Sequence, residues 1–283
     1  MNRISISQAW SYTTSFFNGQ GVNHAIALVG VGIVVPLILQ FLLGNGATML
    51  DPATMAESGT GMMAAMGATG VLLSLVNYVL QTGSYFASWR IGLTNGGEPV
   101  GSAIGYGLIA AFPVLLLAIA IVFVLGILGF LLFGSALMTM ATGGEPSGAA
   151  LMGLGATIFL VLPLFLLFMT WLAARFCCTG PYMADQRSFN VLAGLGASWR
   201  MTAASQWKIF GYFILLGIAL IVIFMILGMV VGVTAMAGGA PGSMLGLIVG
   251  AIVLSVPMAY LQVGVPAGLY RALGGTSTSE VFA

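Results

Sequence analysis

The sequence predicts an all-α polytopic membrane protein with six transmembrane helices, arranged as three repeated helical hairpins that are each preceded by a short interfacial amphipathic helix. Three observations lead to this prediction. Of the 283 residues, 60% are hydrophobic and only 5% are charged, whereas globular domains carry about 25% charged residues. Long apolar stretches follow one another along the chain, and the basic residues fall on one side of the resulting topology.

The apolar run Leu151–Arg175 meets its first charge at Arg175. Because about 20 apolar residues suffice to cross the hydrocarbon core as a helix, this run predicts a transmembrane span. Two other predicted spans end in the same way, at Arg90 and Arg271. The chain is therefore organised around three helices that each end at an arginine.

Residues 5–18 predict a short amphipathic helix before the first span. Ser5 or Ser7 can cap its start, and its apolar residues recur at helical spacing. Trp10 and Tyr12 suit the headgroup level of a membrane. Since no signal-peptide pattern precedes the first span, we expect that span to be retained as an anchor. The alternative for residues 5–18 is an ordinary cytosolic lead-in.

Six apolar stretches follow along the chain. They are about Asn23–Leu43, Met62–Trp89, Ala103–Phe133, Ala149–Arg175, Trp207–Thr234 and Ser243–Tyr270. The third stretch is too long for a perpendicular helix, so Pro113 is predicted to mark the point where an interfacial lead-in becomes the spanning part. Thr94–Pro99 is rich in turn-forming residues, and Ala235–Gly242 is predicted to be an uncharged loop.

All seven basic residues fall on one side of this topology. They are Arg3, Arg90, Arg175, Arg187, Arg200, Lys208 and Arg271. Because cytoplasmic loops carry the excess of Lys and Arg, this side is predicted to be cytoplasmic, with both termini there. An odd number of spans would scatter these bases over both faces, which favours six.

The chain is predicted to be one transmembrane domain, residues 1–283, with repeats at about 1–95, 96–187 and 188–283. Each repeat contains a lead-in helix, a span, a loop, a second span, an arginine and a turn. The lead-in helices are predicted to begin near Ile6, Val100 and Val191. Since each repeat begins and ends on the same side of the membrane, the repeats are parallel.

Three short motifs resemble a known family. They are Ile4–Trp10, Ser198–Thr202 followed by Trp207 and Lys208, and Leu269–Gly275. The plan resembles the membrane domain attached to some bacterial glycerophosphoryl diester phosphodiesterases, and the related YciC-type inner-membrane proteins. This resemblance implies a six-helix fold in a bacterial inner membrane. It does not imply the phosphodiesterase activity, which in that family belongs to a separate soluble barrel that this sequence leaves no residues to form.

The sequence offers no arrangement of catalytic groups. Hydrolysis or group transfer needs a nucleophile with a base, or a metal site. The single histidine, His24, falls at the cytoplasmic start of the first span, where we favour an interfacial polar anchor over a pH-sensitive or headgroup contact. All six acidic residues lie in predicted loops or the tail. We therefore expect no enzyme, no cofactor and no metal site, and the net charge of +1 gives no footprint for nucleic acid.

The strongest polar groups inside the predicted spans are uncharged. Asn77, Gln81 and Ser84 share one face of the second span, and Gln262 lies in the sixth. These residues could line a polar crevice or hold a lipid headgroup. The alternative, which we favour, is hydrogen bonding between helices, worth about 0.6 kcal/mol per bond.

Arg90, Arg175 and Arg271 are candidate ligands for anionic lipid headgroups, because a planar guanidinium matches phosphate oxygens in a bidentate way. The alternative is that they only set the topology as snorkelling anchors. The leading hypothesis is a non-catalytic inner-membrane protein that contacts anionic lipids or partner membrane proteins at its cytoplasmic face. The rival hypothesis is a carrier or channel for lipid or a small neutral solute.

Two further patterns have a structural and a functional interpretation. Cys177 and Cys178 suit S-acylation or thiol redox chemistry, but we favour two small buried residues. Glycine pairs spaced by four residues predict close helix packing, within the chain or in self-association. The pairs are Gly228/Gly232, Gly246/Gly250 and Gly264/Gly268.

Overall fold

The computed structural model describes residues 5–43, 68–141, 148–237 and 239–275. Within these ranges the chain is helical and contains no strand, which confirms the all-α prediction. Arg3, the predicted loop at 44–60 and most of that at 139–147 lie outside the described residues.

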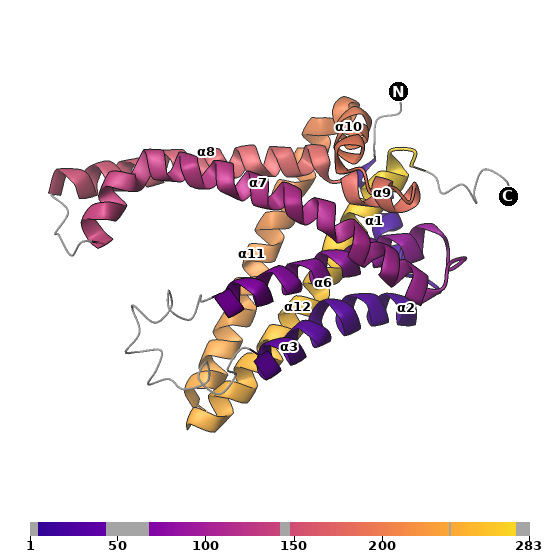
Figure 1. Ribbon diagram of the computed structural model, residues 1–283, viewed down its shortest axis with the longest axis horizontal. Coiled ribbons are helices and arrows are strands. Elements are labelled where there is room, and N and C mark those ends of the chain that lie inside the picture. The colour runs from indigo at the N-terminus through magenta and orange to yellow at the C-terminus, as the bar shows by residue number, and fades with distance from the viewer. Residues whose placement is uncertain (1–4, 44–67, 142–147, 238, 276–283) are drawn as a thin grey trace.

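Long helices account for most of the described chain (Figure 1). In order, they are a continuous helix made of α2 (Gly21–Ala25), the π-helical turn Ile26–Val34 and α3 (Val35–Leu43), then α6 (Ala68–Leu93), α7 (Val100–Ala141), α8 (Gly148–Phe176), α11 (Gln206–Ala237) and α12 (Gly239–Ala272). The shorter helices are α1 (Ile6–Ser15), α9 (Thr179–Asp185), α10 (Val191–Thr202) and the 3₁₀ turn Ala203–Ser205. The predicted loop Ala235–Gly242 is helical at all its described positions.

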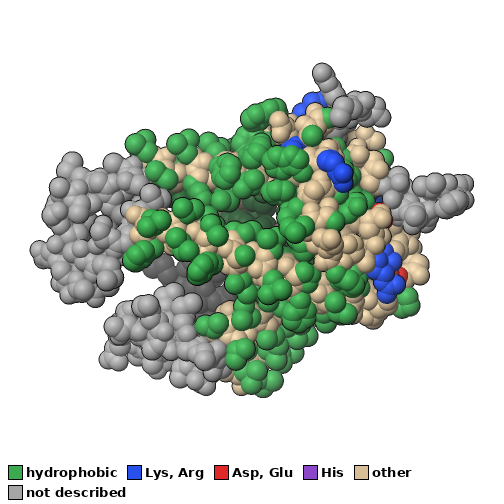
Figure 2. Space-filling model, turned by 45° about the horizontal axis from the view of Figure 1, so that its top comes forward, with side chains coloured by type: hydrophobic (Ala, Val, Ile, Leu, Met, Phe, Trp, Pro, Cys, Tyr) green, Lys and Arg blue, Asp and Glu red, His purple; other side chains and the backbone are tan. Residues whose placement is uncertain are grey.

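Four segments of the described chain are long and apolar enough to cross a membrane. They are Gly21–Leu43, Val100–Leu131, Phe159–Asp185 and Val191–Ile226. Large apolar side chains are exposed along these segments, and Figure 2 shows them over the helices while Lys and Arg gather at one end of the visible face. Because so much apolar surface is stable only against lipid, the chain is a multi-pass helical membrane protein. The six-span arrangement remains a prediction.

The predicted lead-in helices have different outcomes. α1 and α10 are separate short helices that begin at Ile6 and Val191, as expected. The second lead-in is not separate, because α7 runs from Val100 through Pro113 without a break. Proline is tolerated inside membrane helices, where neighbouring groups can satisfy the carbonyl that it frees.

The buried core is formed by residues of α1, α6, α9, α10 and α12, together with the first turns of α7 and α11 and the end of α8. Here α1 packs on α12, with Ala9 and Thr13 against Gly264 and Gly268. A Cβ atom at Gly268 would lie 2.6 Å from the carbonyl oxygen of Ala9, so only glycine permits this approach. Close packing at this glycine pair is thus confirmed, although its partner is the short α1 rather than another span.

Candidate functional site

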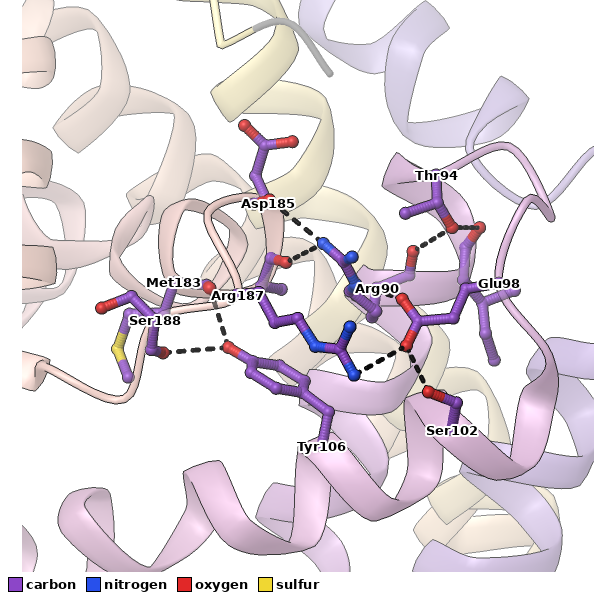
Figure 3. Close-up of polar contacts among 11 residues, drawn as sticks. Arg90, Thr94, Glu98, Ser102, Tyr106, Met183, Asp185, Arg187 and Ser188 are labelled. Carbon is purple, nitrogen blue, oxygen red and sulfur yellow. Dashed lines mark hydrogen bonds and ion pairs between the residues drawn. The ribbon is translucent and has the colours of Figure 1, made fainter. Parts of the chain in front are cut away.

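A polar network surrounds Arg90, which lies in the last turn of α6 (Figure 3). The Nε of Arg90 donates to Oε2 of Glu98 at 2.5 Å, forming an ion pair. The turn after α6 brings Glu98 back over the helix end, where its Oε1 accepts from the hydroxyl of Ser102 at 2.6 Å. Nη2 of Arg187 lies 3.7 Å from the same oxygen. Glu98 therefore faces two guanidinium groups from different parts of the chain.

The environment of Glu98 lowers its pKa. Partial burial acts to raise the pKa, but hydrogen bonds from Ser102 and Arg90 and the positive charges of Arg90 and Arg187 outweigh it. The net shift is below the ordinary value of 4.5, so the carboxylate is ionised at neutral pH.

Arg90 also binds the end of α9. Its Nη1 donates to the backbone carbonyls of Ala184 at 2.9 Å and Asp185 at 3.1 Å. The hydroxyl of Tyr106, from α7, lies 2.7 Å from the carbonyl oxygen of Met183. A cation at the carboxyl end of a helix satisfies carbonyls that have no partner within the helix. α6 and α7 thus hold α9 in place together.

Arg271, at the end of α12, is bound in a similar way. Its Nη2 donates to the backbone carbonyl of Gly92 at 2.9 Å, and lies 3.4 Å from Oδ1 of Asn95. The preceding residue, Tyr270, donates from its hydroxyl to Oδ2 of Asp185 at 2.9 Å. The end of α12 is therefore fastened to the turn after α6 and to α9.

Arg175 differs from the other two arginines. It is only 3% exposed, and its Cζ lies 3.8 Å from the centroid of the Trp199 ring. Nε and Nη1 of its guanidinium are enclosed without a hydrogen-bond partner. Its backbone carbonyl accepts from the hydroxyls of Ser198 at 2.8 Å and Thr202 at 3.2 Å, which holds α8 on α10. The cation is thus fixed in position, with two of its nitrogens left without an acceptor.

The predicted set of lipid-binding arginines therefore does not form a uniform collar. Arg90 and Arg271 use their donors on protein acceptors, while Arg175 has enclosed donors left over. Aromatic rings surround Arg175, since Trp171 packs edge-on against Trp199 at 5.7 Å and Phe176 lies 5.6 Å from the same ring. Such a cluster is typical of the membrane–water interface.

The predicted polar face of α6 is divided in the structure. Ser84 is buried against Gly32, so closely that a Cβ atom at position 32 would clash with the serine side chain. The hydroxyl of Ser84 donates to the backbone carbonyl of Gln81 at 2.7 Å. The side chain of Gln81 is exposed, and Oδ1 of Asn77 is enclosed without a partner. Gln262 lies elsewhere, in the wall of a cavity that none of these three lines. The four residues do not form one site.

That cavity of about 420 Å³ lies between α6, α8, α11 and α12 and is partly open. Its wall is apolar except for Tyr85, Cys177 and Gln262. The lining residues are Tyr85, Ala173, Cys177, Phe213, Leu216, Gly217, Leu220, Met258, Leu261, Gln262, Val265 and Pro266. No acidic or basic side chain is among them.

The cysteines are two free thiols. Cys177 is half-buried in the cavity wall and Cys178 is buried, with 3.7 Å between their sulfur atoms. In the part of the chain that the structure describes, no three His, Cys, Asp or Glu residues are grouped to hold a metal ion.

The structure corrects the prediction for His24. This residue is fully buried instead of anchoring the interface, because the rings of Phe16 and Phe17 lie over it at 5.3 and 4.9 Å between centroids. Its Nδ1 lies 2.6 Å from Oγ of Ser88, which was not predicted. Helical spacing offered one signal, since Ser88 continues the face that carries Ser84.

Sequence reasoning also missed the partners of the arginines. Glu98 stands eight positions after Arg90 across a predicted turn, so their pairing could have been proposed. No such signal exists for the contacts of Arg90, whose partners Ala184 and Asp185 lie 94 and 95 residues away. None exists for Arg175 either, because its partner Trp199 lies on a different helix.

Comparison with known proteins gave one family match. Neither the curated proteins nor the solved structures contain a match to this chain. The match covers less than half of the chain, and it concerns a membrane domain instead of a catalytic one. It confirms the resemblance noted above: residues 150–267 match the family model of the membrane domain of glycerophosphoryl diester phosphodiesterase.

Proposed function

We propose that this chain is a non-catalytic integral protein of the bacterial inner membrane that binds anionic lipid through Arg175. One observation carries the proposal: a guanidinium that is 3% exposed has two nitrogens without an acceptor. Arginine stays charged in proteins, and a buried charge without a counter-charge destabilises the fold. A phosphate oxygen would supply the missing acceptor.

The surroundings of Arg175 favour a phosphate that is carried by a membrane lipid. The aromatic residues beside it suit the headgroup level, and Trp199 is 40% exposed. Arg200 and Lys208 are exposed on the neighbouring turns, where they would add attraction to an anionic membrane surface. Lipid would thus reach Arg175 by displacing the surface-facing ring of Trp199.

The proposed topology has six spans, three parallel repeats in one domain and both termini in the cytoplasm. The one-sided distribution of basic residues in the sequence and the six long helices of the described residues support it. Single cysteines introduced into a cysteine-free variant test it, with Gln186→Cys on the arginine side and Asp51→Cys or Gly144→Cys on the other. A membrane-impermeant maleimide should label only Gln186→Cys from the cytoplasmic side. Labelling of Asp51→Cys from that same side would contradict the topology.

The lipid proposal is tested by native mass spectrometry with equal amounts of phosphatidylglycerol and phosphatidylcholine. Wild type should retain phosphatidylglycerol preferentially, and Arg175→Gln should lose this preference. Arg271→Gln should keep it, because the guanidinium of Arg271 already has a protein acceptor, the backbone carbonyl of Gly92. Unchanged preference in a folded Arg175→Gln protein would refute the assignment.

A carrier for lipid or a small neutral solute is the second candidate function. The observation that favours it is the partly open cavity between α6, α8, α11 and α12. Self-association through glycine-rich faces, or binding of another membrane protein, is less well supported because α1 covers Gly264 and Gly268. Transfer of fluorescent lipid between the two leaflets of reconstituted vesicles would test the lipid carrier, and rates equal to those of protein-free vesicles would exclude that carrier.

A further inference from the structure

The cavity between α6, α8, α11 and α12 lies close to the arginine-bearing end of the helices. Tyr85 precedes Arg90 by five residues, and the wall on α12 extends from Pro266 to Met258. At about 1.5 Å per residue, the walls on α6 and α12 extend from roughly 7 to 20 Å beyond Arg90 and Arg271, whereas Ala173 and Cys177 bring the wall to the level of Arg175. In a membrane, the cavity would therefore extend from the headgroup level into the acyl-chain region.

The cavity wall selects an apolar occupant. Twelve of the described residues line it, and none of them carries a charge, so they offer no counter-charge for a phosphate, a metal ion or a zwitterionic amino acid. A volume of about 420 Å³ falls within the range of small-molecule sites, which are mostly apolar with a few polar groups. The polar groups here are Tyr85, Cys177 and Gln262.

The cavity lining on α11 adjoins the exposed surface of the same helix. Leu216 and Gly217 line it, whereas the adjacent Leu215 and Ile218 are exposed and would face lipid. Because the cavity is partly open and its rim is apolar, an acyl chain can enter sideways from the bilayer without crossing a polar barrier. An apolar cavity left empty costs stability, so occupation by a chain also stabilises the bundle.

We propose that this cavity binds one acyl chain of a membrane phospholipid, with the headgroup outside it at the level of the arginines. The site is separate from the anionic-lipid site, because no basic residue lines the cavity and Arg175 packs on the opposite side of α8, against Trp199. It therefore requires a chain and no particular headgroup.

Gly217 provides a direct test. Gly217 lines the cavity and a Cβ atom at this position meets nothing within 4 Å, so Gly217→Leu should place its side chain in the cavity space. Gly211, on the same helix, is equally open but does not line the cavity, and Gly211→Leu is the matched control. The probe is phosphatidylcholine with a photoreactive diazirine on one acyl chain, reconstituted into vesicles with the protein.

In wild type, the lining residues Leu216 and Leu261 should be crosslinked more strongly than the outward-facing Leu215 and Ile218. Gly217→Leu should abolish this preference and Gly211→Leu should keep it. Equal labelling of inward and outward residues in wild type would overturn the proposal, whether or not the variant folds. Arg175→Gln should leave the labelling intact, so the two lipid proposals succeed or fail independently.

Discussion

The indole N–H of Trp89 donates a hydrogen bond to the backbone carbonyl of Val263 at 2.9 Å. This bond joins α6 to α12 across 174 residues of sequence, beneath the level of the arginines. The ring of Trp89 is 9% exposed and packs edge-on against Phe86 at 5.3 Å. This hydrogen bond therefore joins the first and last thirds of the chain inside an apolar core.

Trp89→Phe should lower the free energy of unfolding by about 1–2 kcal/mol, because it leaves the Val263 carbonyl without this donor and opens space in the core. Thermal unfolding in detergent, followed by circular dichroism, measures the change. Trp207 is 68% exposed on α11, so Trp207→Phe should shift stability by less than about 0.5 kcal/mol. Equal effects of the two variants would show that the Trp89 bond adds nothing.

Glu98→Gln should destabilise the protein by about 2 kcal/mol at neutral pH, because Arg90 and Arg187 lose their counter-charge. Arg200→Gln, an exposed change of similar size, should have little effect. The measurement is again the unfolding transition in detergent, with the helix content of both variants checked beforehand.

The same variant should remove one source of pH dependence. The pKa of Glu98 is lowered below its ordinary 4.5 in the folded protein. The stabilisation is therefore complete above the ordinary value and is lost as the pH falls through the lowered one. Wild type and Glu98→Gln should differ most at neutral pH and converge well below pH 4.5. A difference that stays constant over this range would contradict the ion-pair assignment.

Arg175→Met should raise thermal stability in a neutral detergent on the order of 1 kcal/mol, because an apolar side chain replaces an unpartnered buried charge. Phosphatidylglycerol should stabilise wild type more than phosphatidylcholine does, whereas the two lipids should stabilise Arg175→Met equally, since a ligand stabilises only the state that binds it. If Arg175→Met keeps the extra stabilisation by phosphatidylglycerol, Arg175 does not bind the anionic headgroup.

Gly268→Ala should displace α1 from α12 and cost about 1–3 kcal/mol, because the new Cβ would meet the carbonyl oxygen of Ala9. Gly228 has open space around it, so Gly228→Ala should be neutral or slightly stabilising. Limited proteolysis reports the release of α1 as faster cleavage near Phe16. Unchanged protection of α1 in Gly268→Ala would mean that the two helices accommodate the new Cβ without separating.

The long helices could be predicted because their signal is local: an apolar run of sufficient length needs no knowledge of its neighbours. The same local pattern misplaced the second lead-in, since Pro113 fits the interior of a membrane helix as well as its start. His24 was misplaced for a different reason. Its burial depends on the rings of Phe16 and Phe17 folding over it, which is a tertiary event.

The candidate site was only partly accessible from sequence. The arginines at the ends of α6, α8 and α12 stood out by their isolation after apolar runs, but their different roles depend on partners that sequence spacing does not reveal. Gly92 meets Arg271 across 179 residues, whereas no described acceptor meets Nε or Nη1 of Arg175. Which cation has donors left for a ligand is therefore a property of the packed structure.

The contact between α1 and α12 also sets an order of events during synthesis. A chain emerges from the ribosome from its amino-terminal end, so α1 is made long before Gly264 and Gly268 exist. Until α12 is inserted, Ala9 and Thr13 have no glycine surface to pack on, and α1 must wait at the membrane surface. Docking of the earliest helix is therefore among the final steps of assembly, and it can proceed only on a chain whose last helix is in place.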